Sequence, residues 1–176
     1  MPELKGFKNI AVIQTAFLGD VALALYLTQN IKNFNSDVRL IFVTTPISST
    51  FVSCAKSIDK VISFDKRNLQ QGLKGIKKIS NQLNDLDVDC IIAPHRSLRT
   101  TLINYFSDKK FSVSFDKSVF SFLYSKKVKY RLGLHETMRN NSLLTVFDDT
   151  SEIIDIIPNV EIEVSTDDKV YIENLF

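Results

Sequence analysis

The sequence contains no tryptophan and has few cysteine and histidine residues. Its two cysteines, Cys54 and Cys90, are too few for a disulfide framework, and neither lies at metal-ligand spacing from a histidine or another cysteine. His95 and His135 are the only histidines, which excludes a histidine-rich metal site. We therefore expect no structural zinc, no resident metal and no cofactor, and the free thiols fit a reducing cytoplasm.

Long apolar runs are also absent. No stretch approaches the roughly 18–20 apolar residues that a membrane span requires. No apolar signal core precedes the first expected strand, so we do not expect export. The sequence contains no GxSxG elbow, no Walker loop and no GxGxxG turn. Hydrolase chemistry therefore has no support, and neither ATP nor a dinucleotide is predicted.

The charge of the chain is unevenly distributed. The 176 residues are 44% hydrophobic and 24% charged, which fits a globular domain, and the net charge is +2. Residues 148–168 carry eight acidic side chains and no basic one, whereas residues 1–147 carry 21 basic and 11 acidic side chains. This basic charge favours anionic partners such as phosphorylated sugars, an anionic membrane surface or nucleic acid. Most of the 13 phenylalanines fall in apolar segments, so we expect them in the core and expect no nucleic acid partner.

Apolar strand-like segments alternate with segments of helical spacing. We expect strands at 8–14, 38–44, 60–64, 88–93, 111–115 and 128–130, and helices at 20–34, 48–57, 69–83, 97–106 and 136–147. Strands that are apolar on both faces are typical of a parallel sheet covered by helices on each side. The predicted fold class is a doubly wound α/β domain over residues 1–147. We expect residues 148–176 to be an acidic linker toward further structure.

The turn after the first expected strand is the first candidate site, because ligands bind beyond the carboxyl ends of strands in open parallel sheets. Gly19 would let the backbone approach a ligand, and the helix start offers free N–H groups to an anion. Asp20 has two compatible interpretations. It is a helix N-cap, a general base aimed into the cleft, or both.

The segment after the fourth expected strand is the second candidate. Arg96 and Arg99 lie at a helix start and together suit a phosphate or a carboxylate. In the alternative interpretation, one arginine is solvated and the other pairs with a neighbouring aspartate. His95 by itself is more typical of a hydrogen-bonded structural histidine.

A third candidate follows later in the chain. His135 and Arg139 are four residues apart and share a face if the helix has begun. Their HExxR pattern lacks the second histidine of the zinc-protease motif, which disfavours a metal. The preceding basic run, residues 126–131, is either a solvated face or a contact with anionic lipid headgroups.

Taken in order, these segments resemble the amino-terminal half of the family 9 glycosyltransferases, the ADP-heptose:lipopolysaccharide heptosyltransferases. The order and spacing hold over residues 8–147, and the similarity is greatest to the heptosyltransferase II type. The matching segments are Gln14-Thr15-Ala16-Phe17-Leu18-Gly19-Asp20-Val21, Val61-Ile62-Ser63-Phe64-Asp65-Lys66-Arg67, His95-Arg96-Ser97-Leu98-Arg99-Thr100 and His135-Glu136-Thr137-Met138-Arg139-Asn140. Met138 stands where relatives tend to carry a charged residue.

The resemblance implies a GT-B architecture of two Rossmann-like domains facing across a cleft. The amino-terminal domain would bind the acceptor, the lipopolysaccharide inner core on lipid A, and the other domain would bind ADP-heptose. Transfer would invert the anomeric centre without a metal, in the cytoplasm or at the inner face of the inner membrane. Asp20 would be the catalytic base, and the implied acceptor-binding residues are Gly19, Arg67, His95, Arg96, Ser97 and Arg99.

The resemblance also implies a missing part, since such families are roughly twice as long as one domain of this size. We expect transfer only once a donor-binding half is supplied. Two alternatives differ in class. The chain could be a non-catalytic module that binds anionic glycan or a membrane surface, or a nucleotide-binding Rossmann-like protein, which the missing phosphate-loop fingerprint weakens.

Overall fold

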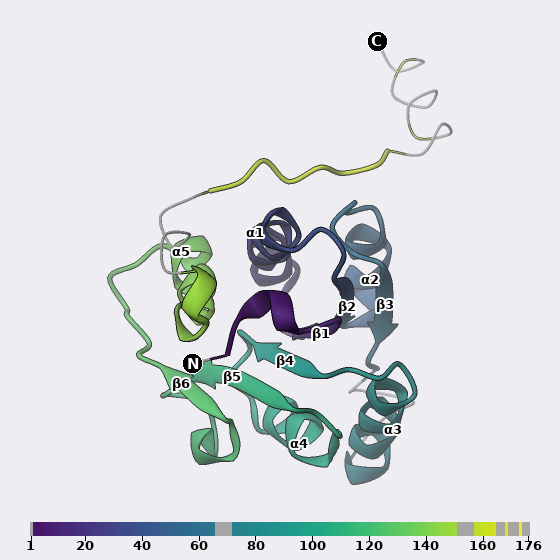
Figure 1. The fold of residues 1–176 in the computed structure, drawn as a ribbon. Coiled ribbons are helices and arrows are strands. Elements are labelled where there is room, and N and C mark those ends of the chain that lie inside the picture. Colours follow the sequence, from purple (N-terminus) through teal and green to yellow (C-terminus); the bar gives the residue numbers. More distant parts are fainter. Residues whose placement is uncertain (1, 66–71, 151–156, 165–167, 169–172, 174–176) are drawn as a thin grey trace.

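The chain folds around one parallel sheet (Figure 1). The computed structural model describes residues 2–65, 72–150, 157–164, 168 and 173. The sheet is six-stranded, in the order β3-β2-β1-β4-β5-β6, and every neighbouring pair is parallel. The strands are β1 (Asn9–Ile13), β2 (Arg39–Thr44), β3 (Lys60–Ser63), β4 (Cys90–Ala93), β5 (Phe111–Phe115) and β6 (Lys126–Val128). The α-helices are α1 (Leu18–Phe34), α2 (Pro46–Ser53), α3 (Gly72–Asn84), α4 (Leu98–Phe106) and α5 (Glu136–Asn141).

Helices cover both faces of the sheet. In Figure 1, α1, α2 and α5 lie above it and α3 and α4 lie below it. Successive side chains of a strand point to opposite faces. In β1, Ile10 and Val12 accordingly join one hydrophobic cluster, whereas Ala11 and Ile13 join the other, and all four are fully buried. The doubly wound α/β fold predicted from the sequence is therefore confirmed.

Most of the predicted elements are present, but several ends differ. Helix α1 begins two residues earlier than expected, with Phe17 as its N-cap. Helix α2 starts at Pro46, because a proline at the first helical position loses no hydrogen bond, and ends at Ser53 rather than at residue 57. Strand β6 lies two residues before its expected position. After α5 the chain tightens into the 3₁₀-helix η3 (Ser142–Val146) instead of continuing as an α-helix.

The apolar stripe predicted for helix α3 is confirmed over most of the helix but not in its first turn. Ile76, Ile79 and Leu83 are buried, as their spacing predicts. Leu73 was expected on the same stripe but is 58% exposed, because it lies in the first turn, before the residues of the helix that are buried. The expected start of this helix at residue 69 lies outside the described residues.

Part of the acidic carboxyl-terminal region lies along the body of the domain. Ile162 forms an antiparallel bridge with Ala55, and Lys56 donates its backbone N–H to the carbonyl oxygen of Glu161 at 3.0 Å. The ammonium of Lys56 lies 2.9 Å from the carboxylate of Glu161, and this pairing raises the pKa of Lys56. The packed unit also continues slightly past residue 147, because Thr150 is fully buried. The remainder of the expected linker (residues 151–156) and most of the segment after residue 164 lie outside the described residues.

None of the described helices is both long enough and apolar enough to cross a membrane.

Candidate functional site

The two strand-end segments that the sequence singled out meet at one place. From β1 the chain winds outward through β2 and β3, and from β4 it winds the other way through β5 and β6, so β1 and β4 flank the topological switch point. A crevice at their carboxyl ends is where ligands bind in such sheets. Thr15, just after β1, places its Oγ1 2.9 Å from Nδ1 of His95, just after β4. His95 therefore joins the two candidate segments, and Thr100 Oγ1 at 3.3 Å ties it also to α4.

A pocket of about 740 Å³ opens at this edge. Its wall comes from the ends of four strands: Ala16, Phe17, Leu18, Gly19, Thr45, Pro46, Ile47, Phe64, Asp65 and His95. Phe17 and Ile47 are 80% and 83% exposed, so the rim is apolar. A cavity of this size, with an apolar rim and a few polar groups, suits a small organic ligand.

Sequence reasoning missed the contribution of β2, and after β3 it named Arg67 but not Asp65 as a site residue. Thr45 and Ile47 flank Pro46 directly after β2, and Asp65 follows β3. The same strand-end rule that pointed to Gly19 and His95 applies to these positions, with Pro46 as the visible end of the strand. Arg67, the third-strand residue that the resemblance implied, lies outside the described residues.

Gly19 and Asp20 begin helix α1. Gly19 lines the pocket, and a Cβ atom added there would meet nothing within 4 Å, so the space beside its backbone is open to a ligand. Asp20 is the third residue of the helix and half-buried. The prediction that Asp20 is the N-cap is wrong, because the helix begins two residues earlier and Phe17 takes that position.

Asp20 lies in the first turn of α1 and is not among the residues that line the pocket. Within the described part of the chain it has neither an ion pair nor a side-chain hydrogen bond. The dipole of α1 favours a negative charge in its first turn. The structure therefore places the unpaired carboxylate of Asp20 on the residue that follows Gly19, which lines the pocket.

The two arginines lie at the start of α4. Ser97 is the N-cap of this helix, and its Oγ accepts the backbone N–H of Thr100 at 3.3 Å. Arg96 directly precedes the cap and Arg99 lies in the first turn, both exposed. Neither forms an ion pair with an acidic residue among those the structure describes, so the alternative of an aspartate partner is wrong. Because a helix dipole opposes cations at the amino end, an anion bound here would relieve that repulsion.

Tyr130 positions Arg96. The Arg96 guanidinium lies over the Tyr130 ring, 3.9 Å from its centroid, and the Arg139 guanidinium lies 4.5 Å from the same centroid. Arg139 also donates a 2.7 Å hydrogen bond to the Tyr130 hydroxyl. Cations within about 6 Å of an aromatic face are attracted to it. The third candidate segment is thus in contact with the second through Arg96 and Tyr130.

Arg139 and His135 have structural roles of their own. Arg139 is buried and donates to the backbone carbonyls of Arg131, Leu132 and Leu134, and it forms an ion pair with Glu136. His135 is the N-cap of α5, and its Nδ1 accepts the backbone N–H of Thr137 at 3.4 Å. These contacts close the loop before α5. Across the described residues, no three histidine, cysteine or acidic side chains gather where they could hold a metal.

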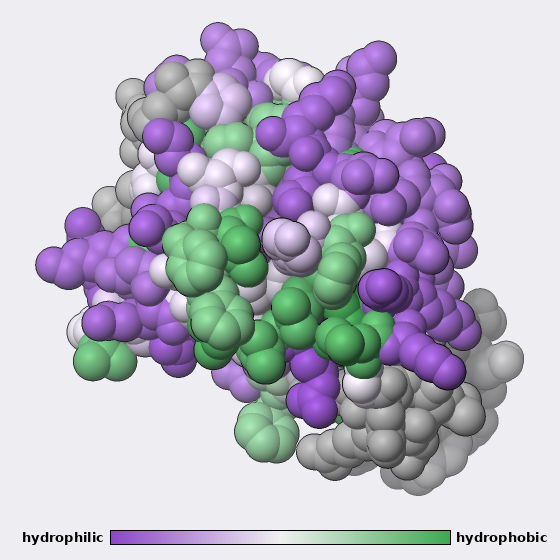
Figure 2. All heavy atoms as spheres, turned by 90° about the horizontal axis from the view of Figure 1, so that it is seen from below, coloured by the Kyte–Doolittle hydropathy of each residue, from purple (hydrophilic) through white to green (hydrophobic). Residues whose placement is uncertain are grey.

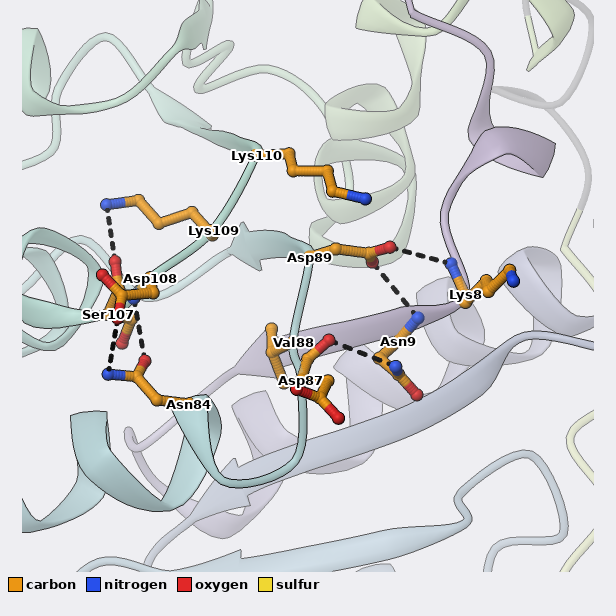
Figure 3. A pocket seen from close by; sticks show the side chains of 10 residues that line it. All are labelled: Lys8, Asn9, Asn84, Asp87, Val88, Asp89, Ser107, Asp108, Lys109 and Lys110. Carbon is orange, nitrogen blue, oxygen red and sulfur yellow. Dashed lines mark hydrogen bonds between the residues drawn. The ribbon is translucent and has the colours of Figure 1, made fainter.

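A second hollow, of about 810 Å³, lies at the amino ends of the strands, opposite to the pocket at their carboxyl ends (Figure 3). There the Asp89 carboxylate accepts the backbone N–H groups of Lys8 and Asn9, each at 3.2 Å, and Asn84 accepts the backbone N–H of Asp108 at 2.8 Å. Burial lowers the pKa of Lys109, whose ammonium donates to the carbonyl of Ser107. These polar groups tie the loops at the amino ends of the strands together, so we assign no ligand to this hollow.

The fold is similar to those of solved glycosyltransferases. A family 9 glycosyl transferase from Veillonella parvula superposes with a TM-score of 0.83 at 16% identity, over 99% of this chain and 49% of that one. The chain therefore has the Rossmann-like fold of a GT-B glycosyltransferase. ADP-heptose lipopolysaccharide heptosyltransferase II of E. coli gives a TM-score of 0.71 at 14% identity, over 95% of this chain and 50% of that one. E. coli heptosyltransferase WaaC, solved with ADP, gives 0.67 at 14% identity, over 78% and 47%.

These similarities confirm the resemblance read from the sequence at the level of the fold. The chain spans about half the length of the solved structures that it matches. No family model and no curated protein matches the sequence itself.

Proposed function

We propose that this chain is the acceptor-binding domain of an inverting heptosyltransferase, which transfers heptose from ADP-heptose to the inner core of lipopolysaccharide. The observation that carries the proposal is the pair of exposed arginines, Arg96 and Arg99, without acidic partners in the described structure. They lie at the switch point of a fold similar to that of a heptosyltransferase. An inner core that bears phosphates and Kdo carboxylates supplies the anions that such a site requires.

The charge of the domain supports the same acceptor. Residues 1–147 are strongly basic, which would draw a polyanionic glycan toward the surface. Arg96 is held on the Tyr130 ring and Arg99 lies in the first turn of α4. A planar guanidinium that is already oriented loses less entropy when it binds a phosphate or carboxylate.

Asp20 is the proposed general base. Its carboxylate would take the proton from the acceptor hydroxyl as that oxygen bonds to the anomeric carbon of the heptose. The bond from that carbon to the distal phosphate oxygen of ADP would break on the opposite face, which inverts the centre. The donor-binding half would hold ADP-heptose in line for this attack, and such positioning accounts for a large share of the rate.

The test supplies a donor-binding half. The chain is joined to the part of the Veillonella parvula glycosyltransferase that it does not cover, and transfer from ADP-heptose to a deacylated inner-core acceptor is measured. We expect Asp20→Asn to lower kcat by about 10²–10⁴-fold, the usual contribution of a general base. Asp37→Asn, a change of the same kind at an exposed turn, should leave transfer unchanged.

Near-normal turnover of Asp20→Asn would remove Asp20 from the role of base. Retained glycan binding without any transfer by the joined wild-type protein would favour the alternative of a non-catalytic glycan-binding module.

A further inference from the structure

An exposed apolar patch lies on the face that carries α4. Figure 2, which views the molecule from the side of α3 and α4, shows apolar side chains gathered across the middle of this face. We define the patch as Leu98 of α4 together with Val119, Phe120 and Phe122 of the segment between β5 and β6, which are 43%, 42%, 51% and 71% exposed. The sequence predicts that the phenylalanines lie in the core, and this prediction is wrong for Phe120 and Phe122.

The patch is a built feature. Phe120 has φ 51° and ψ 47°, in the left-handed region, which is unfavourable for an aromatic residue. Hydrogen bonds fix the segment on both sides of it. The N–H of Val119 donates to the carbonyl of Arg96 at 3.2 Å, and the side chain of Asn104 donates to the carbonyl of Leu123 at 3.1 Å. The rings of Phe120 and Phe122 lie 5.8 Å apart. The segment thus holds two exposed aromatic rings in edge-to-face contact, with Phe120 in a strained backbone conformation.

The same segment is uniformly basic. Residues 117–131 contain five basic side chains and no acidic one, and all five are exposed: Lys117, Lys126, Lys127, Lys129 and Arg131. Lys126 and Lys127 form the edge strand β6. Apolar tips on a basic segment are a combination with which peripheral proteins bind anionic bilayers.

We infer that the patch docks the domain on an anionic bilayer, with Phe120 and Phe122 inserted among the lipid headgroups and the lysines on anionic lipid phosphates. A second copy of the chain is a poorer partner, because a symmetric contact through this surface would bring the two sets of basic side chains together.

The docking has a consequence for the site, which rests on the proposed function. The hydrogen bond from Val119 to Arg96 joins the patch to the loop that holds His95. Docking would therefore bring the arginine site close to the bilayer surface, where an acceptor anchored by lipid A presents its sugars.

The absence of tryptophan allows a direct test. Phe122→Trp introduces a single fluorophore into the patch, and Ile157→Trp introduces one at a 60% exposed position in a segment that Figure 1 shows on the opposite side from α3 and α4. Each variant is mixed with phosphatidylcholine vesicles with or without phosphatidylglycerol. We expect a blue shift and quenching by brominated acyl chains for Phe122→Trp with the anionic vesicles, and neither for Ile157→Trp. Absence of quenching in Phe122→Trp, or equal quenching in both, would overturn the inference.

Co-sedimentation separates the apolar and charged contributions. We expect Phe120→Ser/Phe122→Ser and Lys126→Glu/Lys127→Glu each to lower partition onto anionic vesicles by about tenfold or more. Lys8→Glu/Lys110→Glu makes the same change of charge at the amino ends of β1 and β5, away from the patch, and should bind as the wild type does.

Partition that is unchanged by the aromatic substitutions would overturn the inference. So would self-association without vesicle binding, if Phe120→Ser/Phe122→Ser abolished it, because the patch would then belong to a second copy. Docking that persists in a joined enzyme unable to transfer heptose would count against the proposed function alone.

Discussion

Arg96 is oriented by residues that lie far from it in the sequence. Its guanidinium rests on Tyr130, which Arg139 in turn holds by a hydrogen bond and a second cation–π contact. The sequence pointed to both segments separately. It could not show that they touch, because their contact depends on how β5 and β6 bring the later segment back beside α4. The sequence identifies Arg96 as a candidate because it is a basic residue near a strand end. The residues that support its guanidinium can be identified only from the fold.

Substitutions at these residues test the anion site. We expect Arg96→Ala and Arg99→Ala each to weaken binding of phosphorylated inner-core oligosaccharide by about tenfold or more, since a hydrogen bond to a charged group contributes about 1.5–3 kcal/mol. Tyr130→Leu should weaken binding several-fold because Arg96 loses its platform, whereas Tyr130→Phe keeps the ring and should bind nearly as the wild type does. Titration calorimetry measures each affinity. Unchanged affinity in both arginine variants would contradict the assignment.

The start of helix α1 shows which features of a helix the sequence predicts and which it does not. The sequence placed Asp20 at the amino end of α1 correctly but as its cap, since aspartate is a favoured capping residue. The backbone instead enters the helix at Leu18, with no side-chain cap. Strands were easier to recognise, because β1 and β4 are buried on both faces and read as continuous apolar runs. Short edge strands such as β6 lack that signal, and its position was missed by two residues.

Ser97 allows stability and binding to be separated at one helix. Ser97→Ala removes the cap of α4 and should lower the free energy of unfolding by about 1 kcal/mol. Ser97→Asp keeps a capping oxygen, so its stability in urea denaturation should match the wild type. Its added negative charge beside Arg96 and Arg99 should nevertheless weaken anion binding. Equal stability of Ser97→Ala and the wild type would show that the cap contributes little, and undiminished binding by Ser97→Asp would argue against an anion site here.

Buried titratable groups make the stability of the whole molecule depend on pH. Burial raises the pKa of Tyr124 to about 12, while its hydroxyl donates to Thr101. The folded state therefore keeps this proton above pH 10, where an unfolded tyrosine loses it. Since the folded state binds more protons there, stability is retained below about pH 10 and falls as the pH rises toward about 12.

Tyr124→Phe removes that titration. We expect its free energy of unfolding to fall less steeply between about pH 10 and 12 than that of the wild type, by up to about 2–3 kcal/mol across the range. Burial also raises the pKa of the Cys90 thiol, which adds a decline of the same sign in both proteins. The comparison therefore isolates the tyrosine. Parallel pH profiles for the two proteins would contradict the assigned shift.

An acceptor domain should recognise the inner-core sugar without its donor half. The most direct measurement is a titration of the isotope-labelled chain with deacylated inner-core oligosaccharide, followed through backbone amide shifts, with ADP in a parallel titration. We predict that the oligosaccharide shifts the amides of Gly19, Asp20 and residues 95–100 and that ADP leaves them unmoved. Shifts at these positions with ADP, and none with the oligosaccharide, would contradict the assignment of an acceptor domain.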